Sequence, residues 1–140
     1  MQQDSYNMPG IVEVRYLQPE DVTPNIISSY LAGIPAAVFV EGTRVSLNGE
    51  ASCQAVEEHS NNGRVEKATL TFMTVDDVPR GGVAWMVRQA SSGWWLIGAR
   101  ERPAPVVKIT TSAGQPGGDR AVKTVEVTYQ AYKAMIPLVN

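Results

Sequence analysis

The sequence is poor in the residues that carry most metal sites and most nucleophilic chemistry. Its 140 residues include one cysteine, Cys53, and one histidine, His59. A lone cysteine excludes an internal disulfide framework and every multi-cysteine metal site. We therefore expect no bound metal and no cofactor.

A strong charge of either sign is also lacking. Twelve Lys and Arg stand against fourteen Asp and Glu, which leaves a net charge of −2. Such a chain has no overall positive field to hold a polyanion, so we expect no specific nucleic-acid binding. A local basic patch is compatible with this net charge.

Long hydrophobic runs are absent as well. The longest apolar stretches, such as residues 34–40, are far shorter than the ~20 residues that span a bilayer, which predicts no membrane segment. Residues 1–10 have neither the basic start nor the apolar core of a secretory signal. We expect them to form a polar N-terminal arm on a single β-rich domain that covers residues 1–140.

What the sequence does contain is alternation of apolar and polar residues, cut repeatedly by Gly, Pro and Asn. Val12, Val14 and Tyr16 alternate with Glu13 and Arg15, a pattern that predicts a first strand with one buried face. Thr23 as cap and Pro24 at the first helical position predict one short helix that ends before Gly33. Further strands are expected at 34–40, 43–47, 50–58, 65–74, 83–88, 94–98, 106–111 and 122–132.

These strands are expected to pair as consecutive hairpins. Residues 34–40 pair with 43–47, 50–58 with 65–74, 83–88 with 94–98, and 106–111 with 122–132. The polar segment 112–121 is expected to be a mobile loop, and 122–132 is the candidate edge or shared strand. About eight or nine strands at this spacing predict an antiparallel β-sandwich or barrel.

Candidate catalytic groups are few and badly placed. If Cys53 and His59 lie on one extended strand, six residues separate them by roughly 20 Å, beyond proton transfer. We expect Cys53 to be a small buried core residue and His59 to be exposed. Asp76 and Asp77 are adjacent, which is typical of a solvated turn rather than a calcium loop. No catalytic residue is assigned, and a hydrolase using Cys53 ranks last because no base is placed to form the thiolate.

Three tryptophans fall in one predicted hairpin. Trp94 and Trp95 are adjacent on a strand, so they must point to opposite faces, and Trp85 lies on the strand before them. Either both faces of this hairpin are covered within the chain, or one Trp is an anchor on an interaction surface.

Further interface candidates follow this hairpin. The charged residues Arg100, Glu101 and Arg102 end the strand before a proline-rich segment. They are either solvated charges or partners in ion pairs between subunits. Tyr129, on the long closing strand, is the last candidate.

The segment 95–107, the long closing strand and the terminal Ile136, Pro137 and Leu138 resemble the C-terminal part of small β-rich structural proteins of tailed phages and prophages, of the tail-tube or tail-completion (neck) kind. The resemblance covers roughly the last third of the chain. It implies a non-enzymatic virion protein, assembled in the bacterial cytoplasm into homo-oligomeric rings or a tube that contact other virion proteins.

A second function from another class stays open. A monomeric carbohydrate-binding module of lectin type would stack a sugar on an outward Trp, with Arg100 or Glu101 as hydrogen-bonding partners.

Overall fold

The computed structural model describes residues 4–38, 40–49, 51–60, 63–90, 93–101, 104–112 and 122–139. The strands are β1 (Asp4–Leu17), β2 (Thr43–Val45), β3 (Ala51–Ser60), β4 (Gly63–Thr74), β5 (Ala84–Gln89), β6 (Gly93–Ile97), β7 (Val106–Ser112), β8 (Val122–Ala131) and β9 (Met135–Pro137). A 3-10 turn (Pro19–Asp21) and the helix α1 (Ile26–Leu31) lie between β1 and β2.

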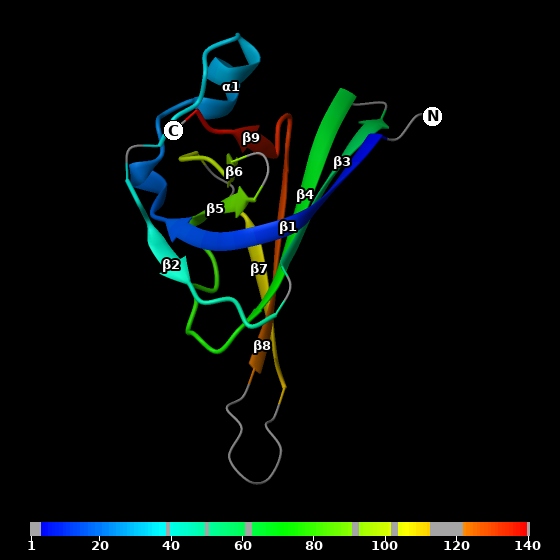
Figure 1. Ribbon diagram of the computed structural model, residues 1–140. Coiled ribbons are helices and arrows are strands. Elements are labelled where there is room, and N and C mark those ends of the chain that lie inside the picture. The colour runs from blue at the N-terminus through cyan, green and yellow to red at the C-terminus, as the bar shows by residue number, and fades with distance from the viewer. Residues whose placement is uncertain are drawn as a thin grey trace, which may run out of the picture.

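All strand pairs are antiparallel, and they form one sheet of nine strands. The order is β7-β8-β4-β3-β1-β5-β6-β9, and β2 pairs with β1 beside this path. The two ends of this path do not pair with each other, so the sheet is strongly curled but not closed (Figure 1). The predicted mainly-β architecture, an antiparallel sandwich or barrel of about eight or nine strands with one short helix, is confirmed, and the open sheet corresponds to a sandwich or an open barrel.

Strand β1 bends and belongs to both halves of the sheet. Its first part pairs with β3, and its second part, from Ile11 to Leu17, pairs with β5. The register shifts between Met8 and Ile11, where Gly10 has a φ of +81°, a conformation that other residues adopt only under strain. Residues 4–10, which the sequence analysis expected as an arm, are therefore the first half of this strand.

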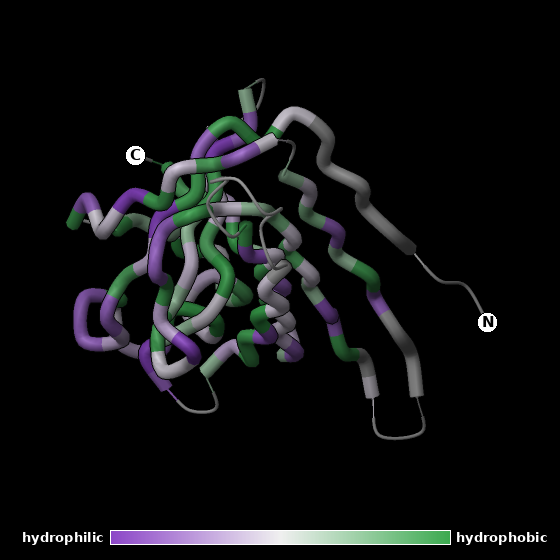
Figure 2. Tube along the Cα trace, turned by 90° about the horizontal axis from the view of Figure 1, so that it is seen from below, coloured by the Kyte–Doolittle hydropathy of each residue, from purple (hydrophilic) through white to green (hydrophobic). Residues whose placement is uncertain are grey.

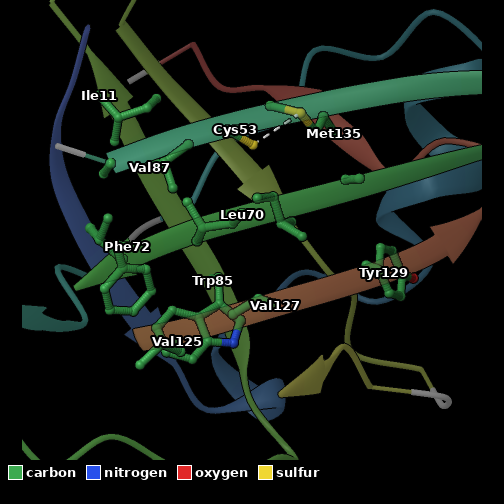
Figure 3. Close-up of a cluster of buried hydrophobic side chains, with 14 of the residues drawn as sticks. Ile11, Cys53, Leu70, Phe72, Trp85, Val87, Val125, Val127, Tyr129 and Met135 are labelled. Carbon is green, nitrogen blue, oxygen red and sulfur yellow. Dashed lines mark hydrogen bonds between the residues drawn. The ribbon is translucent and has the colours of Figure 1, made fainter. Parts of the chain in front are cut away.

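The main core fills the space that the curled sheet encloses. Trp85 on β5 and Phe72 on β4 are both fully buried, with ring centroids 5.7 Å apart. Tyr16 on β1 contacts the same indole at 5.8 Å, edge to face. Figure 3 shows Trp85 beside Phe72, Val125 and Val127 in this cluster. Residues from both halves of the sheet therefore meet in one core.

A second cluster lies on the other face of β5 and β6, under residues 22–38, which contain α1 and which we call the α1 segment. Its members come from the sheet, from α1 and from the loops beside them: Leu17, Val22, Ile26, Ala36, Val38, Ala84, Met86, Leu96, Ala99 and Ile136. In Figure 1 this segment lies beside β9 at one end of the molecule. The α1 segment thus gives this part of the sheet a cover on its second face.

The hairpins predicted at β3–β4, β5–β6 and β7–β8 are confirmed by their registers. Along the β3–β4 hairpin, which extends from the rest of the molecule in Figure 2, the backbone alternates between hydrophobic and hydrophilic positions, whereas β5 is buried at four successive residues.

Two predictions about strands were wrong. Of the described residues in 34–40, only Ala36 makes a bridge, to Leu138, because this stretch covers the second cluster instead of joining a hairpin. The strand β8 is not an edge, since it lies between β7 and β4. The expected loop at 112–121 begins at Ser112, the last residue of β7, and its remaining residues lie outside the described part of the chain.

A buried carboxylate holds β9 against β4. Glu66 is 4% exposed, and its Oε1 accepts the backbone N–H groups of Ala134 at 2.9 Å and Met135 at 3.0 Å. Lys133 Nζ lies 3.3 Å from the other oxygen. The charge is therefore compensated by three donors, as a buried carboxylate requires. These contacts of Glu66 help to hold the short β9 on the sheet.

Phe72 provides a test of the core. We expect Phe72→Ala to lower the free energy of unfolding by about 3–5 kcal/mol, because it leaves a cavity against Trp85. Urea denaturation followed by circular dichroism measures this. The matched control is Met73→Ala on the next residue, whose side chain points to the other face and is 40% exposed. Equal losses for both variants would contradict the assigned core.

Candidate functional site

The tryptophans of the β5–β6 hairpin lie as strand alternation requires. Trp85 is fully buried in the main core. Trp95 is half-buried and packs against that same core, whereas Trp94 packs against the second cluster on the opposite face. Both faces of the hairpin are thus covered within the chain, and Trp94 and Trp95 keep partial exposure.

The other predicted interface residues are spread over the molecule. Arg100 and Glu101 are exposed in the bend after β6, and Glu101 Oε2 accepts the backbone N–H of Asn25 at 3.0 Å, just before α1. Tyr129 is 5% exposed in the main core, where burial and then the charge of Glu101 raise its pKa. Arg102 lies outside the described residues.

A cluster that sequence reasoning missed surrounds Trp94. The guanidinium of Arg15 lies 5.8 Å from the ring centroid of Trp94, and that of Arg88 lies 6.0 Å from it. Glu13 bridges the two arginines, with Oε2 2.5 Å from Arg15 Nε and Oε1 3.4 Å from Arg88 Nε. We call Glu13, Arg15, Arg44, Arg88 and Trp94 the Arg–Trp cluster. It combines cation–π contacts with charge-assisted hydrogen bonds.

Strand register brings the Arg–Trp cluster together. Glu13 on β1 lies opposite Arg88 on β5, and Arg88 lies opposite Trp94 on β6. On the other side of β1, Arg15 lies opposite Arg44 on β2. The only signal in the sequence was that charged residues occupy one face of the first predicted strand. Their partners could not be named, because β1 and β5 are far apart in the chain.

Glu13 is 7% exposed, so the ionised form of its carboxyl group needs compensation. Burial raises its pKa, but the hydrogen bond and charge of Arg15, the charge of Arg44 and the hydrogen bond from Arg88 outweigh burial. The net result is a pKa below the ordinary value of 4.5. Glu13 is therefore ionised at neutral pH and holds the guanidinium groups of Arg15 and Arg88 in place.

A lowered pKa in the folded state makes stability depend on pH. The contribution of ionised Glu13 is present above the unfolded-state pKa, near 4.5, and is lost as pH falls through the folded-state pKa. We expect Glu13→Gln to cost about 1–3 kcal/mol at pH 7 and progressively less below pH 4.5. Urea denaturation at a series of pH values measures the difference, and a cost that stays constant down to pH 3 would exclude this role.

Cys53 does not have the surroundings of a nucleophile. Its side chain is fully buried, and burial raises the pKa of the thiol to about 12. Its Sγ lies 3.5 Å from Met135 Sδ (Figure 3) and also hydrogen-bonds with the backbone of Gln54. The expectation of a buried core cysteine is confirmed. The side chain of His59 lies outside the described part of the chain.

This burial predicts slow alkylation. With a pKa of about 12 against 9.0, the folded protein holds on the order of 1000-fold less thiolate at pH 8 than the unfolded chain. We expect iodoacetamide to leave Cys53 unmodified in native buffer and to modify it fully in 8 M urea, as read by intact mass. Rapid modification in native buffer would show that the β3–β4 sheet opens.

The acidic pair at 76–77 is a structural turn. Asp76 Oδ2 accepts the backbone N–H of Ser46 at 2.8 Å, and Asp77 pairs with Lys123 Nζ at 2.5 Å. The hydrogen bond from Lys123 is the main reason why the pKa of Asp77 is lowered. Among the described residues, no three His, Cys, Asp or Glu side chains gather where they could hold a metal ion.

Apolar side chains remain exposed beside α1. Leu31 is 58%, Ile34 57% and Val139 68% exposed, and together with Pro35 and Leu138 they line a shallow groove between α1 and the C-terminal segment. Exposed apolar groups that gather in this way are typical of contact surfaces.

Comparison with known proteins gives no family. No protein-family model matches the chain, and no curated protein or solved structure matches it significantly. Within the described residues, no helix combines the length and apolar character needed to cross a membrane.

Proposed function

We propose that this chain is a non-enzymatic structural subunit of a phage tail or neck, which assembles with copies of itself into rings or a tube. The observation that carries the proposal is the open sheet, which ends on one side in the seven-residue strand β7. Assembly in the bacterial cytoplasm and contacts with other virion proteins belong to the same proposal. They are supported by the resemblance of 95–107 and 136–138 to tail proteins.

The edge formed by β7 lacks the usual protection against pairing. Its seven residues are mostly β-branched, with Lys108 as the one charge and no proline. Within the described residues β7 pairs only with β8, and Val106 is 68% exposed. The other end of the sheet, β9, is three residues long and ends in Pro137. Natural edge strands are commonly short or carry charge or proline, so the β7 edge favours pairing with another strand.

The second copy of this chain is the partner that suits the β7 edge. A β7 edge that meets a different surface of the neighbouring copy makes a heterologous contact, and such contacts close into rings or extend into tubes. The apolar groove beside α1 offers a second surface for contacts of this kind.

The carbohydrate-binding alternative has one observation in its favour. Trp94 is half-buried beside Arg88, and both residue types are common in sugar sites. This alternative predicts a monomer whose tryptophan fluorescence changes on addition of glycans, and that the change disappears in Trp94→Phe.

The assembly proposal is tested by measuring the mass in solution. Light scattering after size exclusion, from micromolar to millimolar protein, is expected to show a defined multimer well above 15.2 kDa, with rings or tubes in negative-stain images. A monomer at every concentration, together with no particles in the images, would overturn the proposal.

Variants of the edge locate the contact. We expect the double substitution Val106→Lys with Thr110→Lys to weaken association at least about tenfold, because lysines along an edge oppose strand pairing. The control is Met73→Lys, on the same face of the sheet but two strands inward, since Met73 lies opposite Thr124 and Thr124 opposite Thr110. Equal weakening by both variants would move the contact from the edge to the face.

A further inference from the structure

We propose that Arg15, Arg44, Arg88 and Trp94 form a site for an oxyanion, either a phosphate or a carboxylate group. The proposal does not depend on the assembly proposed above. It rests on an excess of positive charge in the Arg–Trp cluster and on the way in which Glu13 fixes the arginines.

The Arg–Trp cluster carries more positive than negative charge. Three guanidinium groups of the cluster share the single buried carboxylate of Glu13. Arg15 and Arg44 lie directly opposite each other on β1 and β2, an arrangement of like charges that destabilises a sheet unless an anion compensates it. Arg44 makes no hydrogen bond or ion pair with the described residues. The side chain of Glu41 is exposed, and only its backbone oxygen contacts Arg15, at 3.3 Å.

Glu13 and Trp94 hold Arg15 and Arg88 in place. Glu13 accepts from the Nε atoms of both Arg15 and Arg88, which leaves their terminal nitrogens for other acceptors. Both terminal nitrogens of Arg88 and Nη2 of Arg15 have no acceptor among the described residues. The ring of Trp94 lies against both guanidinium groups and restricts them further. Arginines held in this way lose little entropy when they bind an anion.

The arginines of the Arg–Trp cluster can be reached from the solvent. The α1 segment covers Leu17, Met86 and Leu96 on this face of the sheet, whereas the row formed by Glu13, Arg88 and Trp94 lies at its margin. The side chain of Arg88 is 42% exposed and that of Arg15 is 22% exposed. A guanidinium fork that is partly desolvated but reachable suits bidentate binding of phosphate or carboxylate oxygens.

The test uses the fluorescence of Trp94 to report the binding of an anion. The full chain is titrated with sodium pyrophosphate and, separately, with a tetraglutamate peptide, both at constant ionic strength, and tryptophan fluorescence and calorimetry are recorded. We expect saturable binding of at least one probe, and a fluorescence change that is lost in Trp94→Phe. Binding of pyrophosphate alone identifies a phosphate ligand, whereas binding of the peptide identifies a carboxylate on a protein partner.

Two variants and one control decide the outcome. Arg88→Gln and Arg44→Gln are expected to weaken binding at least tenfold each, and Arg44 is exposed, so its replacement leaves folding intact. Arg80→Gln changes an exposed arginine outside the cluster and is expected to leave binding unchanged. No saturable binding of either probe, or equal weakening by Arg80→Gln and Arg44→Gln, would overturn the oxyanion site. Neither result would bear on the mass measurement, which tests assembly separately.

Discussion

The pairing of β1 with two different strands is the constraint on which the rest of the structure depends. Ile11 stands at the junction, opposite Ala51 on β3 and opposite Gln89 on β5. Because β1 passes from one half of the sheet to the other, the sheet must curl, and the curl brings Phe72 of β4 onto Trp85 of β5. The left-handed conformation of Gly10 permits the change of register at this point. The main core is therefore a consequence of how a single strand bends.

The local part of the fold was predictable and the nonlocal part was not. The hairpins β3–β4, β5–β6 and β7–β8 were correct, because alternation and turn residues lie within one short stretch of sequence. The stretch 34–40 has the same apolar character, but its buried residues Ala36 and Val38 pack in the second cluster, and Ala36 forms an isolated bridge to Leu138 outside the named strands. The apolar composition indicates that such residues are buried. Only tertiary packing decides whether they form a strand of the sheet or an irregular segment that packs on its face. The strand β9 was missed because its three residues are too few to show an alternation of apolar and polar positions.

The site residues divide in the same way. The opposite orientation of Trp94 and Trp95 followed from strand geometry alone, and so did the burial of one small free cysteine. The sequence could not show that Trp94 lies between Arg15 and Arg88, since this depends on the pairing of β1 with β5. Nor could it show that Tyr129 lies in the core, because β8 turned out to be an interior strand.

The same pairing sets the order in which the chain can fold. Glu13 and Arg88 are separated by 75 positions in the sequence, so β1 cannot complete its ladder until more than half of the chain has left the ribosome. The β3–β4 hairpin is synthesised before β5, so β1 can pair with β3 while its other partner, β5, is still missing. Sheets that depend on such distant pairs close slowly, on the order of milliseconds to seconds. Because β7 follows β5 and β6 in the chain, its exposed edge leaves the ribosome only after β1 can pair with β5.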